Sequence, residues 1–196
     1  KPNLQNLMRL RLRAVRGQLG YKLPALLWRR CELREPQLPG GGPVREVLLG
    51  DDAEADAFVY SLYADVCSGT VDSHELAEVM RLGGVYDDSI REAVRLAGYV
   101  QRGEVVERIL IHLDRQSAPS EFKAYGGRVV PFYNSLQAAL VLHEDGRIPA
   151  AAVLRVGLEL VVSHNFDPSA LARSHIDLVR RGHLTGSGLP SLDDEL

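Results

Sequence analysis

The stretch that decides the fold is VREVLLGDDAEADAFVYSLYADV, residues 44–66. It opens with an apolar run over 44–49, rich in the valine and leucine that favour a buried strand, and that run stops at Gly50-Asp51-Asp52. Apolar residues then recur at the three- and four-residue spacing of a helix: Val59, Leu62, Tyr63 and Val66. The stretch predicts a strand, an acidic turn and a helix, in that order.

Two further strands are predicted at 106–113 and 128–132, each too apolar for a half-exposed strand and therefore typical of a central, parallel one. Strands that alternate with helices need right-handed crossovers and bind ligands at their carboxyl ends. We therefore predict an α/β protein with a Rossmann-like three-layer α/β/α arrangement, a partial parallel sheet and extra helices. Three strands leave a hydrophobic edge, so we expect another strand from upstream or a homo-oligomer to cover it.

The N-terminal region reads as two helices. Apolar residues at helical spacing predict the first over 4–19, with Gly20 as its left-handed C-cap. Pro24, whose fixed φ suits a first turn, opens the second through Leu33. Lys22 would then lie in the junction, ahead of a helix N-terminus.

The remaining helices are marked by their caps. Asp72 and Glu75 have the spacing of a capping box, with the helix running to about residue 80, and Asp87 or Asp88 is expected to cap the next. A helix is predicted from Asn134 to about residue 143.

We expect a single domain over 1–184, with a helical insertion at about 70–100 and C-terminal helices at about 147–182, the second of them capped by Asp167. The Pro- and Gly-rich stretch 36–43 is expected to be a mobile connection and 185–196 a flexible tail.

Composition limits the class of protein. The 196 residues are 45% hydrophobic and 25% charged, and no apolar run approaches the roughly 20 residues that a transmembrane segment needs. Cys31 and Cys67 lack metal-ligand spacing, which favours free thiols and a cytoplasmic location.

The net charge of −3 is unevenly divided. Residues 1–34 hold nine basic residues against one acid, a net of +8, and the rest carries −11. The basic segment suits a phosphorylated ligand, an anionic lipid surface or the acidic remainder of the same protein. Without interleaved aromatic and basic residues on a negative body, no nucleic acid partner is expected.

Three carboxylates stand close together where the first strand stops: Asp51, Asp52 and Asp56. They repel one another when ionised, so a hard cation or a basic residue is needed to neutralise them. Mg²⁺ takes oxygen ligands and is commonly held by one or two carboxylates while it bridges a phosphate. The alternative is that Asp52 and Asp56 only cap the helix and complement its dipole.

Residues 48–60, LLGDDAEADAFVY, resemble the fourth motif of the haloacid dehalogenase (HAD) superfamily, a hydrophobic strand followed by GDxxxxD. They most resemble the version with a Tyr four residues after the second Asp, found in phosphatidate phosphatases of the actin-patch-protein type and their bacterial relatives. Lys22 precedes this strand where the third motif places its lysine, and residues 109–115, ILIHLDR, are similar to the next strand of those relatives.

The resemblance implies that Asp51 is a Mg²⁺ ligand, that Asp56 orients a metal-bound water or the lysine, and that Lys22 neutralises the nucleophile and the phosphoryl group. Asp52 stands where relatives often have a hydroxyl residue, and it either joins the metal or caps the helix. The implied activity is a Mg²⁺-dependent phosphatase that works through an aspartyl-phosphate. Its substrate would be a small phosphorylated molecule or a phospholipid head group.

The chain has no DxDxT/V sequence, the source of the nucleophilic aspartate in this superfamily, so the hypothesis places that residue on an upstream segment. One alternative is a non-catalytic HAD-like scaffold for protein or lipid interaction. Another alternative is a receiver-like phosphoacceptor in which Asp114 is phosphorylated. Such a protein needs a lysine at the end of a later strand, and the only lysine that follows is Lys123, in a predicted loop.

Overall fold

The structure is a computed structural model that describes residues 12–33 and 43–185. It divides the chain, which the sequence assigned to a single domain, into two compact units, Lys1–Pro131 and Phe132–Leu196. Residues 1–11, 34–42 and 186–196 lie outside the described residues. The start of the first predicted helix, most of the connection predicted at 36–43 and most of the tail predicted at 185–196 fall there, so these stay predictions. Each unit is described by itself.

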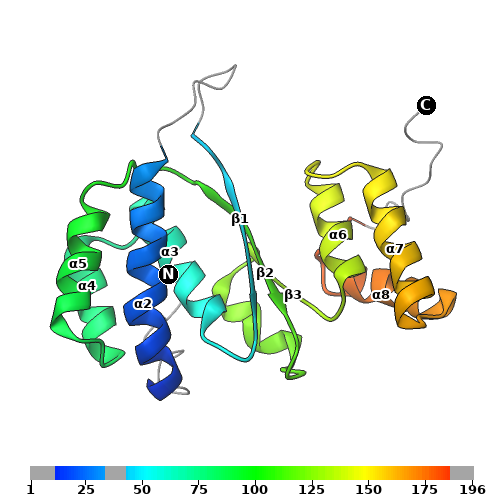
Figure 1. Cartoon of the computed structure of the whole chain (residues 1–196), viewed down its shortest axis with the longest axis horizontal. Coiled ribbons are helices and arrows are strands. Elements are labelled where there is room, and N and C mark those ends of the chain that lie inside the picture. Colours follow the sequence, from blue (N-terminus) through cyan, green and yellow to red (C-terminus); the bar gives the residue numbers. More distant parts are fainter. Residues whose placement is uncertain (1–11, 34–42, 186–196) are drawn as a thin grey trace. The chain divides into compact units, whose positions relative to one another are not determined.

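Three strands form one sheet in the order β1-β2-β3: β1 (Glu46–Asp51), β2 (Val106–His112) and β3 (Val129–Phe132). β1 and β2 run parallel, from the pair Glu46 and Val106 to the pair Asp51 and His112 (Figure 1). The predicted α/β fold with a three-stranded parallel sheet and flanking helices is confirmed. A central position was predicted for β2 and β3. It is confirmed for β2 and was wrong for β3, which has only β2 as a neighbour within the described residues.

Helix α2 (Leu12–Glu32) is continuous where the sequence predicted two helices. Leu19, Leu23 and Leu27 are fully buried along one side of it. Burial of each is worth about 1.5–3 kcal/mol, which together exceeds the roughly 3 kcal/mol cost of Pro24 inside a helix. Gly20 is a packing position and not a C-cap, because a Cβ there would lie 3.2 Å from Val85.

Three more helices complete the helical layer: α3 (Asp56–Ser68), α4 (Ser73–Leu82) and α5 (Asp87–Ala97). The predicted capping box is present, since Asp72 accepts from the backbone N–H of His74 and Glu75. The cap predicted for α5 was wrong by one residue: Tyr86 is the N-cap, and Asp87 and Asp88 lie in the first turn, where they complement the helix dipole. Both α4 and α5 contact α2, so residues 70–100 belong to the helical layer (Figure 1).

The core of the first unit lies between this layer and one face of the sheet. Ile109 and Ile111 of β2 point into it and are fully buried, together with Val59, Leu62 and Met80 from the helices. This packing of the helical layer on the sheet fixes the position of the start of α3 relative to the carboxyl end of β1.

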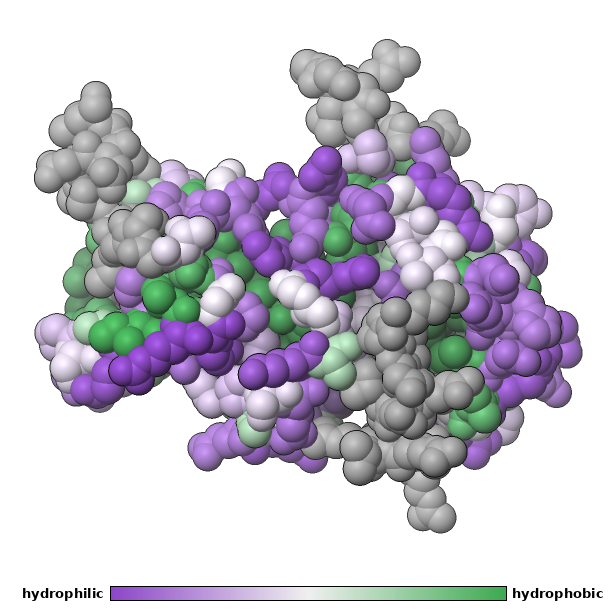
Figure 2. Space-filling model, turned by 180° about the vertical axis from the view of Figure 1, so that it is seen from behind, coloured by the Kyte–Doolittle hydropathy of each residue, from purple (hydrophilic) through white to green (hydrophobic). Residues whose placement is uncertain are grey.

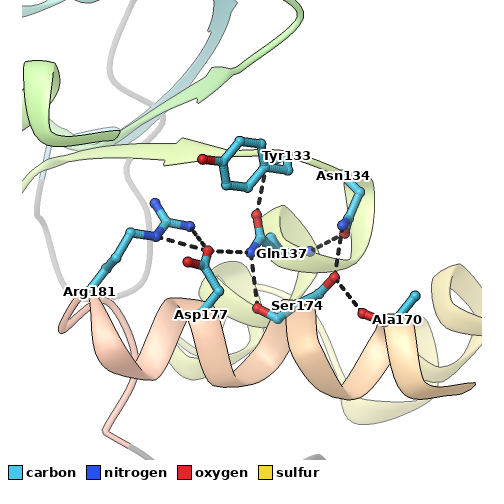
Figure 3. Close-up of polar contacts among 7 residues, drawn as sticks. All are labelled: Tyr133, Asn134, Gln137, Ala170, Ser174, Asp177 and Arg181. Atoms are coloured by element: carbon cyan, nitrogen blue, oxygen red, sulfur yellow. Dashed lines mark hydrogen bonds and ion pairs between the residues drawn. The ribbon is translucent and has the colours of Figure 1, made fainter. Parts of the chain in front are cut away.

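The described part of the second unit, residues 132–185, contains three helices, as predicted: α6 (Ser135–Glu144), α7 (Ala150–His164) and α8 (Pro168–Arg180). Asn134 and Asp167 cap α6 and α8 through side-chain hydrogen bonds. A buried amide ties α8 to α6: the side chain of Gln137 donates to Ser174 O and Asp177 Oδ2, each at 2.9 Å, and accepts from Tyr133 N (Figure 3).

The surface is not uniformly polar. Figure 2 shows hydrophobic patches between hydrophilic ones on the face seen from behind. Within residues 12–33 and 43–185, no helix combines the length and apolarity required to cross a membrane.

Candidate functional site

The acidic turn lies at the carboxyl end of the parallel pair β1 and β2. Asp51 is the last residue of β1 and is aligned with His112, the last residue of β2. Its Oδ1 accepts the backbone N–H of Ala53 at 2.9 Å and that of Glu54 at 3.2 Å. The carboxylate therefore stabilises the turn that leads into α3.

The close approach of Asp56 to Gly50 explains why the motif has a glycine at position 50. Asp56 is 4% exposed, and its Oδ2 accepts the backbone N–H of Asp51 at 3.2 Å. A Cβ on residue 50 would lie 2.4 Å from that Oδ2 and 2.5 Å from Cβ of Asp56. Only a glycine leaves room for the Asp56 carboxylate at the end of the strand.

Lys22 reaches this turn from α2. Its Nζ donates to Asp56 Oδ1 and, at 2.5 Å, to Glu54 Oε2. Burial by itself lowers the pKa of Lys22, but its hydrogen bonds to the two carboxylates and their negative charges outweigh that effect and raise it well above its ordinary value. Lys22 is therefore a permanent positive charge and not a proton donor at neutral pH.

Tyr60, the tyrosine of the motif, fastens α3 to β1 through a hydrogen bond from its hydroxyl to Leu49 O at 3.2 Å. Burial and the neighbouring charge of Asp56 raise the pKa of Tyr60. The phenol therefore stays protonated and acts as a donor that fixes the end of the strand.

The structure gives Asp52 a role other than the metal ligand suggested by the sequence. Its carboxylate is 3% exposed and accepts the backbone N–H of Arg115 at 2.8 Å and of Ser117 at 2.9 Å. Burial by itself raises the pKa of Asp52, yet these hydrogen bonds outweigh it and hold the pKa below its usual range. Asp52 is thus an ionised anchor for the loop that follows β2, and it does not cap α3, whose N-cap is Ala55.

The anchored loop was missed by sequence reasoning. Gln116 adopts φ of 58° between the two amides that Asp52 holds, a conformation uncommon for a residue other than glycine. The loop places the exposed Arg115 beside the acidic turn. Asp52, which accepts the backbone N–H of Arg115, lies 63 residues earlier in the chain, and no local pattern in the sequence indicates this contact.

Asp51 is better suited than Asp52 to act as a ligand of Mg²⁺. Among the described residues none donates to Asp51 Oδ2, which leaves that oxygen for a cation, while both oxygens of Asp52 accept amides. Asp51, Glu54 and Asp56 carry three negative charges, against one positive charge from Lys22, which contacts Glu54 and Asp56. The described residues contain no group of three or more His, Cys, Asp or Glu side chains that could hold a metal ion by themselves.

Asp114, the phosphoacceptor of the receiver-like alternative, is exposed after the end of β2. Lys123 lies in the 3-10 helix η1 (Pro119–Tyr125) and not at the end of a later strand. The structure therefore adds no contact in favour of that alternative.

Scans against protein-family models, curated proteins and solved structures found no match to this chain.

Proposed function

We propose that this chain is the Mg²⁺- and phosphate-handling part of a HAD-like phosphatase that hydrolyses phosphomonoesters through an aspartyl-phosphate. The observation that carries the proposal is the contact of Lys22 with Asp56 and Glu54. It brings the lysine of one proposed motif, on α2, against Asp56, the second acid of the other motif, at the start of α3 and 34 residues later in the chain. Glu54, in the turn between β1 and α3, is the second partner of the lysine.

Asp51 would hold the cation through its Oδ2, aided by the excess negative charge around it. Mg²⁺, when bound, would supply charge stabilisation to phosphoryl oxygens. Asp52 is left out of the proposed metal site because both of its oxygens accept amides from the loop after β2.

Lys22 has an electrostatic role in this proposal. Held by Asp56, its ammonium group keeps one geometry and needs no reorganisation when an anionic ligand arrives. Asp56 is a positioning residue, which orients Lys22 and fixes the Asp51 backbone with its two oxygens.

The proposal requires a nucleophilic aspartate on a strand next to β1. Among the described residues β1 pairs only with β2, and Leu49 on β1 is 59% exposed. A further parallel strand on the open side of β1 would bring its carboxyl end beside Asp51, since the carboxyl ends of parallel strands meet at one edge.

Calorimetric titration of the chain with Mg²⁺, with and without inorganic phosphate, tests the metal site. We expect binding that Asp51→Asn abolishes and that Asp87→Asn, a control at an exposed acid in the first turn of α5, leaves unchanged. Equal binding by the Asp51→Asn variant would contradict the assignment.

Hydrolysis of an aryl phosphate by the complete gene product tests the activity. We expect Mg²⁺-dependent turnover that is lost in Asp51→Asn, and a DxDxT/V strand in the full sequence. If Mg²⁺ binds but no such strand exists, the chain is a scaffold that kept the fold without the reaction.

A further inference from the structure

Large apolar side chains are exposed in a row along helix α7. Leu154, Leu158 and Val162 are 37%, 64% and 70% exposed. Because they are spaced four residues apart, they lie one above another along a single face of the helix. We call these three residues the apolar stripe.

The core of the second unit does not use the apolar stripe. The buried residues of α7 lie on another side of the helix: Ala150, Val153, Gly157 and Leu160. A Cβ on Gly157 would lie 3.8 Å from Leu136 of α6 and 3.9 Å from Leu171 of α8, so both helices already cover that side. A continuous row of exposed apolar side chains, unlike scattered ones, marks an interaction surface.

Two residues of opposite charge border the apolar stripe. Arg155 and Glu159 each directly follow a leucine of the stripe and, four residues apart, lie on the same flank of α7. Both are exposed, and neither forms an ion pair within residues 12–33 and 43–185. An arginine four residues before a glutamate is the less favourable order for a pair within one helix, so both charges remain for a partner.

We propose that the apolar stripe joins two copies of the chain through α7 helices that pack antiparallel. A two-fold axis perpendicular to both helices reverses their direction and brings the same flank of each together. With Leu158 near this axis, Leu154 of one copy meets Val162 of the other. Arg155 of each copy then lies within reach of Glu159 of the other, which gives two ion pairs in a dimer.

A second copy fits this surface because the surface is complementary to itself. Its centre is apolar, and its flank carries one positive and one negative charge, which the same flank in reverse order matches. A parallel pair would put the two charged flanks on opposite sides of the interface. Three side chains form a small contact compared with the roughly 800 Å² that each partner of a stable complex buries, so we expect a weak dimer.

The proposed dimer is independent of the proposed metal site, because α7 belongs to the second unit and Asp51 to the first. Sedimentation velocity of the whole chain from about 5 to about 500 µM, the range suited to a weak interface, measures the association. We expect a sedimentation coefficient that rises with protein concentration over this range.

Substitution of a leucine locates the interface. Leu158→Asp places two carboxylates near the two-fold axis and should weaken the dimer by at least about tenfold. Leu82→Asp is the matched control at a leucine of α4 that is 57% exposed, and it should leave the association unchanged. Circular dichroism checks that each variant is folded.

Charge variants test the antiparallel arrangement. Arg155→Glu makes both members of each ion pair acidic and Glu159→Arg makes both basic, so each variant alone should dimerise about tenfold more weakly than wild type. An equimolar mixture of the two variants should recover the wild-type affinity, because one copy then carries only acids and the other only bases at these positions.

Three results would overturn the proposal. One is a chain that stays monomeric over the whole concentration range. Another is a dimer that Leu158→Asp does not weaken, which would place the interface on a different surface. The third is a mixture of the two charge variants that associates no more strongly than each variant alone.

Discussion

Replacement of Gly50 by alanine tests the geometry on which the site depends. The new Cβ would lie 2.4 Å from Oδ2, 2.5 Å from Cβ and 2.7 Å from Cγ of Asp56. Because ordinary contacts between such atoms are about 3.5–4.0 Å, Asp56 has to move by about 1 Å or more. Rotation of its side chain gives no relief, since its own Cβ is among the atoms that clash.

The expected cost combines two effects. Overpacking costs about 1–3 kcal/mol, and the displaced carboxylate loses contacts with Lys22 and the Asp51 N–H at a site 4% exposed. We expect Gly50→Ala to lower the free energy of unfolding by about 3–4 kcal/mol. Gly127→Ala is the matched control, because a Cβ there would have no neighbour within 4 Å, and it should change stability by less than about 1 kcal/mol.

Urea denaturation followed by Trp28 emission measures the effect, since Trp28 lies on α2, in the same unit as Gly50. Combining Gly50→Ala with Asp56→Gly isolates the clash: in a background that lacks both the Cβ and the carboxylate of residue 56, the alanine should cost less than about 1 kcal/mol. A cost that is the same in both backgrounds, or a Gly50→Ala protein as stable as wild type, would refute the reasoning.

Three further predictions concern charge and burial. Lys22→Met should destabilise the first unit by about 2–4 kcal/mol, because it leaves the buried Asp56 unpaired, and an unchanged urea midpoint would argue against the contact. The pKa of Asp52 is lower in the folded protein than its ordinary 3.8, so its contribution is complete above that pH and is lost as the pH falls through the folded value. The stability difference between wild type and Asp52→Asn should therefore shrink from pH 7 to pH 3, and a constant difference would count against this explanation. Gln137→Leu should destabilise the second unit by about 2–4 kcal/mol, since it leaves the Tyr133 N–H without its acceptor and removes the hydrogen bonds from the amide to Ser174 O and Asp177. Amide hydrogen exchange in α8 that stays as slow as in wild type would contradict this.

Local chemistry made much of the fold predictable. The capping box of Asp72 and Glu75 and the caps at Asn134 and Asp167 depend on residues at most three positions away, so the sequence pattern contains the whole interaction. The apolar run of β2 was equally clear, because a strand buried in a parallel sheet is almost continuously hydrophobic where it is covered. The apolar run of β1 also predicted a strand, although β1 is only partly buried and Leu49 is 59% exposed.

Tertiary packing decided what could not be predicted. By local preference Gly20 ends a helix and Pro24 begins one, yet α2 continues through both because the leucines beside them are buried. The same holds at the site: the contacts of Lys22 with Asp56 and of Asp52 with Arg115 join distant segments. The first was expected from a resemblance, and the second had no signal in the sequence.

The most direct test of the central claim is to locate a divalent cation on the chain. Mn²⁺, a paramagnetic substitute for Mg²⁺, broadens the NMR signals of nearby amides. We predict that the first signals to broaden are those of Asp51, Ala53 and Glu54, and that Asp51→Asn abolishes the effect. Broadening that begins instead at the exposed acids of α5, or that persists in Asp51→Asn, would contradict the account.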